Sequence, residues 1–485
     1  MQSLRGSAVP PLIEFDRNSG VPFFKQIYSG FREAILSGRL RPGQRLPSTR
    51  GLAKELGISR LPAIIAFEQL LHEGYIEGKI GAGSYVKDSI PDDLGRPANQ
   101  PGFPNAGSDK PVDSNLPSNE RILGPFRVSL PALDHFPHAV WSQLVSRHAR
   151  NLSLKNMAYG DPAGHLPLRE AIADYLRTAR AVRCEAGQIL IVSGSQMALQ
   201  ICAAALLKKG ESACIEEPGY SGARNALKSA GATLVATAVD CEGIRVTEID
   251  KHGRSVRLCY VTPSHQYPLG MSMTATRRLA LLDWAQSRKS WIIEDDYDSE
   301  FRYASRPLGA LQGMRQNSRV IYVGTFSKVL FPALRIGYMV VPPGLFDRFL
   351  NLREAFDLFS PTLYQLVLTD FLQQGHFARH LRRMRSVYLN RRNAMLTAIE
   401  DHLAKHLAPH NSDAGLHLSA FFHKDKDDLA VVDRAAEEGI SVTALSPCYA
   451  GKRIKKGLIL GYGAANERQI KTAAQKLAKV LQEFS

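Results

Sequence analysis

The stretch from residue 88 to residue 120 limits how this chain can fold. It reads DSIPDDLGRPANQPGFPNAGSDKPVDSNLPSNE, is crowded with Pro, Gly, Asn, Asp and Ser, and has no hydrophobic period. A segment of this kind cannot bury enough apolar surface to fold, so we predict a flexible linker that averages about 30 Å from end to end. The chain must then fold as at least two bodies, which we place at residues 15–87 and 121–485.

The first body has the pattern of a helix-turn-helix. Apolar residues recur at helical spacing over residues 24–35. Ser48 is suited to cap a short helix that Gly57 ends, and Ser59 is suited to cap a second, longer helix. Residues 75–86 (YIEGKIGAGSYV) then alternate around glycines, as a small hairpin would. Two helices joined by a tight turn and followed by a hairpin predict a winged helix, whose second turn-linked helix enters the major groove of DNA.

The turn region carries a family signature. Residues 46–60 read LPSTRGLAKELGISR and resemble the pattern LPSxRxLAxxLGxSR of the GntR family of bacterial regulators. The resemblance covers residues 21–86 and implies a DNA-binding domain. Pro62 and Ala63 stand where the family often has Thr-Val, a change that the first turn of a helix tolerates. A small helical protein-interaction module is the alternative. The residues expected to contact DNA are Arg45, Arg50, Ser59, Arg60, Lys79 and Gly83.

A second functional pattern reads VIYVGTFSKVLFPALRIGY and begins at Val320. A strand-like apolar run opens there into Thr325, Ser327 and Lys328, and ligands collect at such strand ends. The apolar neighbours could desolvate Lys328 and lower its pKa, as a lysine that forms a Schiff base requires. The two hydroxyls and Arg335 could hold a phosphate beside it. A solvated loop lysine is the alternative.

Two other strand-like runs end in groups that suit the same site. The run WIIEDDYDSE contains Asp295 and Tyr297. A carboxylate on the pyridine nitrogen and a phenol on the ring oxygen are what pyridoxal phosphate needs to act as an electron sink. The run ILIVSGSQ contains Ser195 and Gln196, where a helix start would offer free N–H groups to a phosphate. Taken alone, the acidic run could also be a metal site or a solvated rim.

Together these motifs resemble the fold type I pyridoxal phosphate enzymes of the aspartate aminotransferase superfamily. The resemblance covers residues 128–485 and implies an α/β fold. A large part over residues 121–345 would be built on a mainly parallel sheet, and a smaller C-terminal α+β part would cover residues 346–485. The implied roles are the Schiff-base lysine for Lys328, the pyridine-nitrogen partner for Asp295, the ring-oxygen partner for Tyr297 and the phosphate arginine for Arg335.

The resemblance adds three candidates. Tyr220 in CIEEPGY matches the aromatic residue that stacks on the pyridine ring. Tyr159 in YGDPAG matches a tyrosine that reaches the phosphate of the neighbouring subunit's cofactor. His265 in YVTPSHQYPLG is a candidate residue of the binding pocket, because this sequence motif is typical of a subgroup of regulators. Taken alone, Tyr220 would be read as a core tyrosine and Tyr159 as a loop tyrosine.

Two positions depart from the aminotransferase pattern. Tyr267 stands where an asparagine of the family bonds the ring oxygen. The strand-like run LILGY at residues 458–462 lacks the arginine that forks onto a substrate carboxylate. Both departures count against full transaminase turnover.

Charge and cysteine usage agree with a DNA-binding protein. The chain has 61 Lys and Arg against 46 Asp and Glu, a formal net charge of +15, which suggests a polyanionic partner. A basic run within residues 371–392 is either a solvated helix face or a further contact with DNA. The six cysteines lack a Cys-x-x-Cys pair, so we expect no metal site and a reducing cytoplasm. No apolar run is long enough to span a membrane, so no membrane partner is expected.

A GntR-type winged helix joined to a fold type I domain resembles the MocR subfamily of bacterial transcriptional regulators. The resemblance implies a homodimer, domain-swapped, that binds a double-stranded DNA operator. It further suggests that a small amine or amino acid effector displaces Lys328 from its aldimine with pyridoxal 5'-phosphate. Two alternatives stay open: an active aminotransferase that carries a DNA-binding domain, and a scaffold for dimerisation that has lost the cofactor.

Overall fold

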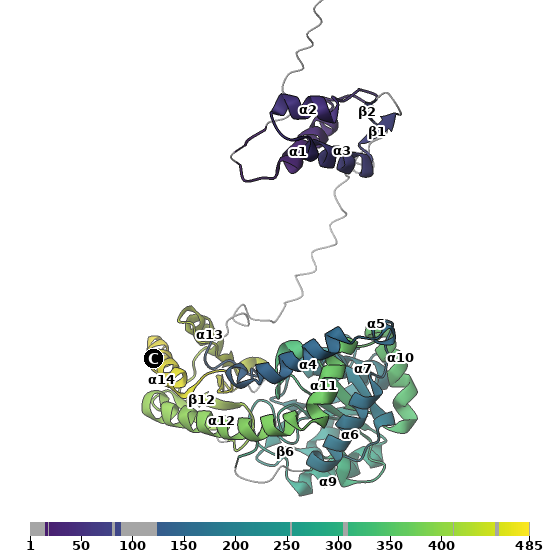
Figure 1. Cartoon of the computed structure of the whole chain (residues 1–485). Coiled ribbons are helices and arrows are strands. Elements are labelled where there is room, and N and C mark those ends of the chain that lie inside the picture. The colour runs from purple at the N-terminus through teal and green to yellow at the C-terminus, as the bar shows by residue number, and fades with distance from the viewer. Residues whose placement is uncertain are drawn as a thin grey trace, which may run out of the picture. The chain divides into compact units, whose positions relative to one another are not determined.

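The computed structural model describes residues 15–17, 19–79, 83–88, 124–252, 255–303, 309–410, 412–451 and 455–484. The chain divides into two compact units, residues 1–114 and 115–485 (Figure 1). Apart from Asp88, the predicted linker lies outside the described residues.

The N-terminal unit is the predicted winged helix. Ser48 caps the second helix by accepting a hydrogen bond from the Gly51 amide at 3.1 Å, and Gly57 ends that helix in the left-handed region at φ 64°. Ser59 occupies the cap position of the third helix, but its hydroxyl makes no capping hydrogen bond. The elements are α1 (Phe23–Leu36), α2 (Thr49–Leu56), α3 (Arg60–His72), β1 (Ile76–Lys79) and β2 (Gly83–Val86).

The hairpin of this unit is antiparallel and is tied to the helices. Ile76 pairs with Val86 and Lys79 pairs with Gly83. Arg45 forms an isolated bridge with Tyr85, so the segment before α2 runs along the edge of the hairpin. Phe31 lies in the hydrophobic core of this unit and is fully buried.

The second unit is built on an eight-stranded sheet in the order β3-β10-β9-β8-β7-β4-β5-β6. Adjacent strands are parallel throughout the series β5, β4, β7, β8 and β9. Strand β10 is antiparallel to both β3 and β9, and β6 is antiparallel to β5. This arrangement confirms the predicted, mainly parallel sheet. The strands are β3 (Ile189–Val192), β4 (Ser212–Glu217), β5 (Thr233–Asp240), β6 (Gly243–Ile244), β7 (Val256–Val261), β8 (Trp291–Asp296), β9 (Val320–Thr325) and β10 (Gly337–Val340).

Helices cover both faces of this sheet. Because side chains alternate along a strand, Ile189 and Ile191 of β3 join one core, and Leu190 and Val192 join another. The first core includes side chains of α4 (His138–Arg150), α6 (Leu166–Arg180) and α11 (Thr362–Gln373). The second core includes side chains of α7 (Ser195–Leu206), α8 (Ser221–Ser229) and α10 (Phe346–Asp357). Helix α9 (Ala275–Arg288) packs on a further cluster, and the short α5 spans Leu154–Met157.

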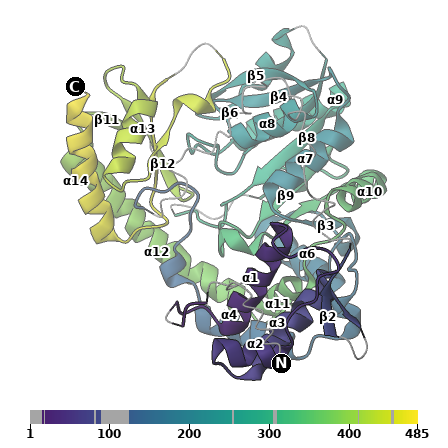
Figure 2. The same ribbon diagram turned by 90° about the horizontal axis from the view of Figure 1, so that it is seen from above.

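The C-terminal part is a smaller α+β layer beside the large sheet (Figure 2). Its four-stranded antiparallel sheet has the order β11-β12-β14-β13, and α12 (His376–Ala398), α13 (Asp428–Glu437) and α14 (Glu467–Glu483) accompany it. Helices α11 and α12 are separate, because Gly375 between them adopts φ 73°. The strands are β11 (Leu407–His410), β12 (His417–Phe422), β13 (Thr443–Ala444) and β14 (Gly457–Gly461).

The predicted basic run lies mainly on α12. Arg379, Arg382, Arg383 and Arg385 are exposed. Arg391 is buried and forms an ion pair with Asp134. None of the helices in the described ranges is long and apolar enough to cross a membrane.

The separate cores predict separate unfolding. Replacing Phe31 by Ala removes a buried ring from the N-terminal core and is expected to lower the free energy of unfolding of that unit by about 3–5 kcal/mol. Calorimetry should show the transition of the N-terminal unit moving to lower temperature while the transition of the larger unit stays in place. A common shift of both transitions would contradict two independently folding units.

Candidate functional site

Several strands of the large sheet end at one edge. Strand β3 is antiparallel to β10, which is antiparallel to β9, so β3 runs in the same direction as β4, β7, β8 and β9. The loops that follow these strands therefore meet at their carboxyl ends, where open α/β sheets bind ligands. The predicted residues on these loops and strand ends are Ser195, Gln196, Tyr220, His265, Asp295, Tyr297, Thr325, Ser327 and Lys328.

Lys328 is a partly buried lysine in the loop after β9. Burial lowers its pKa from the ordinary value of 10.5 to about 8, although the nearby carboxylates Asp298 and Asp295 act in the opposite direction. A substantial fraction of its amine is therefore neutral near physiological pH. A neutral amine is the form that attacks carbonyl groups.

Asp295 lies at the end of β8 with one oxygen already bonded. The Tyr260 hydroxyl donates to its Oδ2 at 2.8 Å, and its buried Oδ1 has no hydrogen-bond partner. Burial raises the pKa of Asp295 to about 7, with the charge of Asp296 acting in the same direction. A buried acceptor of this kind suits a cationic N–H group, such as that of a pyridinium ring.

A polar cradle lies at the start of α7. Arg335 Nη2 donates to the carbonyl of Ser193, and a side chain at Gly194 would lie 3.1 Å from the same nitrogen. Gly194 adopts φ 98° directly before the first turn of α7, whose N–H groups are not used within the helix. The Ser327 amide donates to Thr325 Oγ1 at 3.2 Å. A cation, a helix N-terminus and hydroxyl groups are the donors that bind phosphate.

Aromatic rings form a further wall of the site. The rings of Tyr220 and Tyr267 lie 5.6 Å apart and meet edge to face, and the Tyr267 ring lies 6.3 Å from that of Tyr297. The Gln196 side chain donates to the Tyr220 hydroxyl at 2.8 Å, so Gln196 orients Tyr220. Tyr267 thus stands between two of the predicted cofactor residues.

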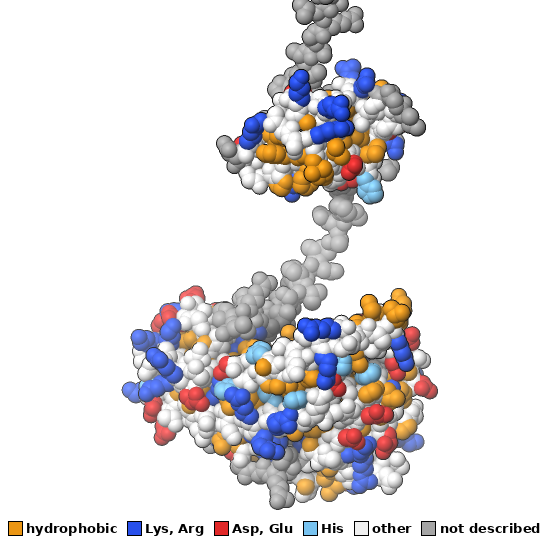
Figure 3. Space-filling model, in the orientation of Figure 1, with side chains coloured by type: hydrophobic (Ala, Val, Ile, Leu, Met, Phe, Trp, Pro, Cys, Tyr) orange, Lys and Arg blue, Asp and Glu red, His pale blue; other side chains and the backbone are white. Residues whose placement is uncertain are grey.

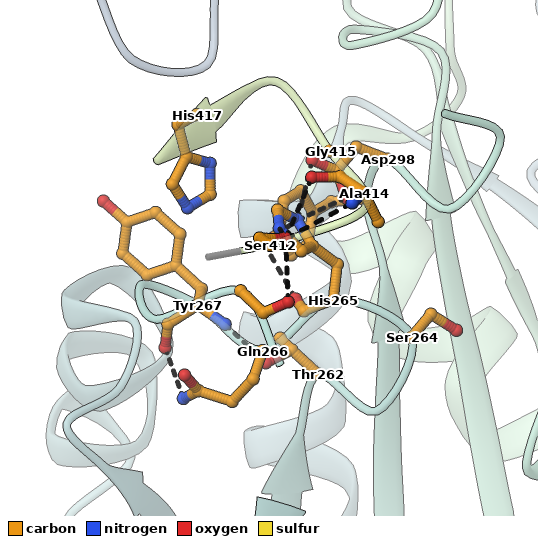
Figure 4. Close-up of polar contacts among 12 residues, drawn as sticks. Thr262, Ser264, His265, Gln266, Tyr267, Asp298, Ser412, Ala414, Gly415 and His417 are labelled. Carbon is orange, nitrogen blue, oxygen red and sulfur yellow. Dashed lines mark hydrogen bonds and ion pairs between the residues drawn. The ribbon is translucent and has the colours of Figure 1, made fainter. Parts of the chain in front are cut away.

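His265 joins the large part of this unit to the smaller part (Figure 4). Its Nδ1 lies 3.0 Å from Asp298 Oδ1, and its Nε2 lies 3.1 Å from Ser412 Oγ, in the loop between β11 and β12. The Tyr297 hydroxyl donates to the His265 carbonyl at 2.9 Å. His417 of β12 places its ring 4.9 Å from that of His265.

We expected no metal site. Among the described residues, one group could offer metal ligands: His265, Asp298 and His417, whose ligand atoms lie within 4.8 Å of one another. Both ring nitrogens of His265 already make the hydrogen bonds described above. We therefore interpret His265 and Asp298 as a hydrogen-bonded pair, next to which His417 Nε2 lies 3.1 Å from the Pro268 carbonyl oxygen.

Tyr159 is not part of the site within one chain. Its side chain is 85% exposed, and its ring lies 6.0 Å from that of Phe359. This placement leaves the side chain accessible to a second copy of the chain.

Three residues that the motif reading did not identify complete the surroundings of Lys328. Tyr260 holds Asp295, Asp298 holds His265, and the charge of Arg127 acts on Lys328. Tyr260 belongs to the run YVTPSHQYPLG and Asp298 to the run WIIEDDYDSE. Neither run indicates that Tyr260 bonds Asp295 or that Asp298 bonds His265.

The predicted DNA-contacting residues all lie on the surface of the N-terminal unit, where Figure 3 shows Lys and Arg side chains. Arg60 Nε donates a hydrogen bond to the Thr49 hydroxyl at 3.2 Å, which orients the guanidinium. Lys79 pairs with Glu77 at 3.3 Å and lies 5.0 Å from the centre of the Tyr85 ring. Exposed cations on a winged helix are available to phosphates.

Comparison with known families gives two matches. Residues 24–86 match the family described as bacterial regulatory proteins, gntR family, and residues 133–477 match aminotransferase class I and II. The chain is 39% identical to the probable rhizopine catabolism regulatory protein MocR of Rhizobium meliloti, over 96% of this chain and 95% of that protein. The chain belongs to the MocR subfamily of GntR-type transcriptional regulators.

Other members and solved structures agree with this placement. The HTH-type pyridoxine biosynthesis transcriptional regulator PdxR of Corynebacterium glutamicum is 31% identical over 91% of this chain and 92% of its own length. The kynurenine aminotransferase of Pyrococcus horikoshii, solved with PMP, aligns with a TM-score of 0.69 and 27% identity over 75% of this chain and 91% of its own. LysN of Thermus thermophilus, complexed with N-(5'-phosphopyridoxyl)-L-leucine, aligns with a TM-score of 0.70 and 26% identity over 76% and 95%.

The lowered pKa of Lys328 can be measured directly. In the protein without cofactor, the rate at which an amine-modifying reagent labels Lys328 should rise with pH with a midpoint near 8, because the reagent attacks the neutral amine. Mass spectrometry of the labelled peptide gives the rate, with the exposed Lys228 as the internal control. A midpoint for Lys328 close to 10.5 would show that its surroundings do not desolvate it.

Proposed function

We propose that this protein is a pyridoxal phosphate-dependent transcriptional regulator that senses a small amine or amino acid at Lys328. The observation that carries the proposal is the partly buried Lys328 near the buried Asp295, in a chain that also has a winged helix. The relatives named as transcriptional regulators support a regulatory role for the same combination.

The donors present suit the cofactor. Lys328 would carry it, the unpartnered Oδ1 of Asp295 would accept the ring N–H, and Tyr297 would face the ring oxygen. Arg335, Thr325, Ser327, Ser195 and Gln196 would surround the phosphate, and Tyr220 would cover the ring. When bound, pyridoxal phosphate supplies an aldehyde that condenses reversibly with primary amines.

The residues around Lys328 suggest how a signal leaves the site. If an effector amine took the place of Lys328 on the cofactor, the lysine amine would be free near Asp298, whose carboxylate also holds His265. His265 in turn bonds Ser412 in the smaller part of the unit. A change of charge at Lys328 therefore reaches the contact between the two parts through two hydrogen bonds. An effector regulates only if it binds the two resulting arrangements with different affinity.

The regulator would act as a homodimer on double-stranded DNA in the bacterial cytoplasm. Apolar side chains gather on the surface near α5 and the end of α10: Leu154, Met157, Tyr159, Phe356 and Leu358 are each at least half exposed. Exposed apolar side chains of this number favour burial against a second copy. Tyr159 would then reach the neighbouring cofactor, and a domain-swapped arrangement would place each winged helix over the partner subunit.

DNA contact is tested by Arg60→Gln. Loss of one phosphate contact should weaken binding to all duplexes and reduce the slope of log affinity against log salt by about 1. Fluorescence anisotropy with a duplex selected from random sequence measures both quantities. The control is Arg39→Gln, which removes the same charge from the residue that pairs with Glu33. Equal effects of the two substitutions would argue against a specific role for Arg60.

The sensing step is tested by Lys328→Ala. This variant should lose the visible absorbance of the bound cofactor and the response of DNA binding to amines, while it still binds DNA, because the winged helix has its own core. Absorbance and anisotropy are measured on the same sample. If the variant kept both its chromophore and its response, Lys328 would not be the sensing residue.

A further inference from the structure

The strand that should supply a carboxylate-binding arginine cannot do so. Residues 458–462 of β14 and its end read LILGY. Ile459 is fully buried in a cluster with Leu269 and Cys448. A Cβ at Gly461 would collide with the carbonyl oxygen of Arg127, and a Cβ at Gly463 would collide with that of Leu130. This end of the strand is therefore covered by the backbone of residues 127–130, which leaves no room there for a long side chain.

The covering segment is fixed on both sides of Arg127. The Phe126 carbonyl accepts a hydrogen bond from the Gly461 amide at 2.9 Å, and the Pro125 carbonyl accepts one from Ser441 at 3.0 Å. The Phe126 ring is fully buried, and the Val128 side chain packs on the cluster that contains Ile459. Arg127 is thus held at the end of β14 by its two neighbours.

The backbone around Arg127 is strained. Phe126 adopts φ 70° and Ser129 adopts φ 67°, in the left-handed region that side chains other than glycine seldom occupy. Such strain persists only where the surrounding structure enforces it, and it concentrates at ligand-binding sites.

Arg127 lies near the Lys328 site. Its neighbour Phe126 pairs with Gly461, and Gly461 pairs with His417 of β12, whose ring lies 4.9 Å from that of His265. Burial is the main cause of the lowered pKa of Lys328, and the positive charges of Arg335 and Arg127 act in the same direction. Arg335 donates a hydrogen bond to the Ser193 carbonyl and belongs to the polar cradle at the start of α7. Arg127 is half-buried and is not one of the residues proposed to surround the cofactor.

We propose that Arg127 binds the carboxylate of an amino acid effector, in place of the arginine that β14 lacks. The inference rests on the proposed sensing of an amine at Lys328 and narrows the effector class to amino acids. The amine would face Lys328 and the carboxylate would face the guanidinium of Arg127. A guanidinium pairs with a carboxylate through two parallel N–H donors, which a lysine or glutamine cannot reproduce.

The test compares amines with and without a carboxylate. The cofactor-loaded protein is titrated with ω-amino acids of increasing length and with the alkylamine that matches each one, and the cofactor absorbance is followed. The unmodified protein should bind the best amino acid more tightly than its alkylamine. Arg127→Gln should weaken binding of that amino acid about ten- to a hundredfold and leave the alkylamine unchanged. Arg127→Lys should recover part of the loss.

A second titration uses propionate, which has a carboxylate but no amine, and detects binding by NMR. The control is Arg257→Gln, which removes the same charge from an exposed arginine whose guanidinium donates to the Lys289 carbonyl. Unchanged cofactor loading and melting temperature show that Arg127→Gln is folded. If Arg127→Gln keeps the amino acid preference and the propionate binding, the assignment of Arg127 is wrong.

The two titrations separate the two proposals. If no amine changes the absorbance but propionate binds and depends on Arg127, the carboxylate site stands and amine sensing fails. If amines bind but the protein shows no preference for the carboxylate, amine sensing stands and the role of Arg127 fails.

Discussion

The burial of Lys328 among carboxylates is the constraint on which the rest of the larger unit depends. A lysine at a sheet edge is ordinarily charged and solvated, whereas the carboxyl ends of β3, β4, β7, β8 and β9 enclose this one and lower its pKa to about 8. The same enclosure raises the pKa of Asp295 to about 7. Burial thus disfavours the charged forms of both Lys328 and Asp295. A ligand with a cationic ring nitrogen suits Asp295, and a ligand that reacts with a neutral amine suits Lys328.

The surroundings of Lys328 also connect it to the smaller part of the unit. His265 reaches Ser412 across that junction, and the segment that carries Arg127 pairs with Gly461 at the end of β14. A ligand held between Lys328 and Arg127 would therefore touch both sides of the junction. Small differences in ligand charge can then favour one arrangement of the two parts, which is what a regulator needs.

Much of the fold was predictable because its signals are local. The capping by Ser48, the left-handed Gly57 and the strand-to-loop runs around Asp295 and Lys328 each lie within a few residues of chain. The bond from Tyr260 to Asp295 spans 35 positions, and that from His265 to Ser412 spans 147. Contacts at such separations arise from the sheet order and from the packing of β12 and β14, which no local pattern records. For the same reason the sequence showed that β14 lacks an arginine but could not indicate Arg127.

Sensing at Lys328 is tested most directly by following the cofactor and DNA binding together. The cofactor-loaded protein, bound to a labelled operator duplex, is titrated with an amino acid while absorbance and anisotropy are recorded in one cuvette, and the cofactor is then extracted and identified. Both signals should change with the same midpoint, and pyridoxal phosphate should be recovered unaltered. Steady conversion to pyridoxamine phosphate, with DNA binding unaffected, would contradict sensing at Lys328 and would identify the larger unit as a working aminotransferase.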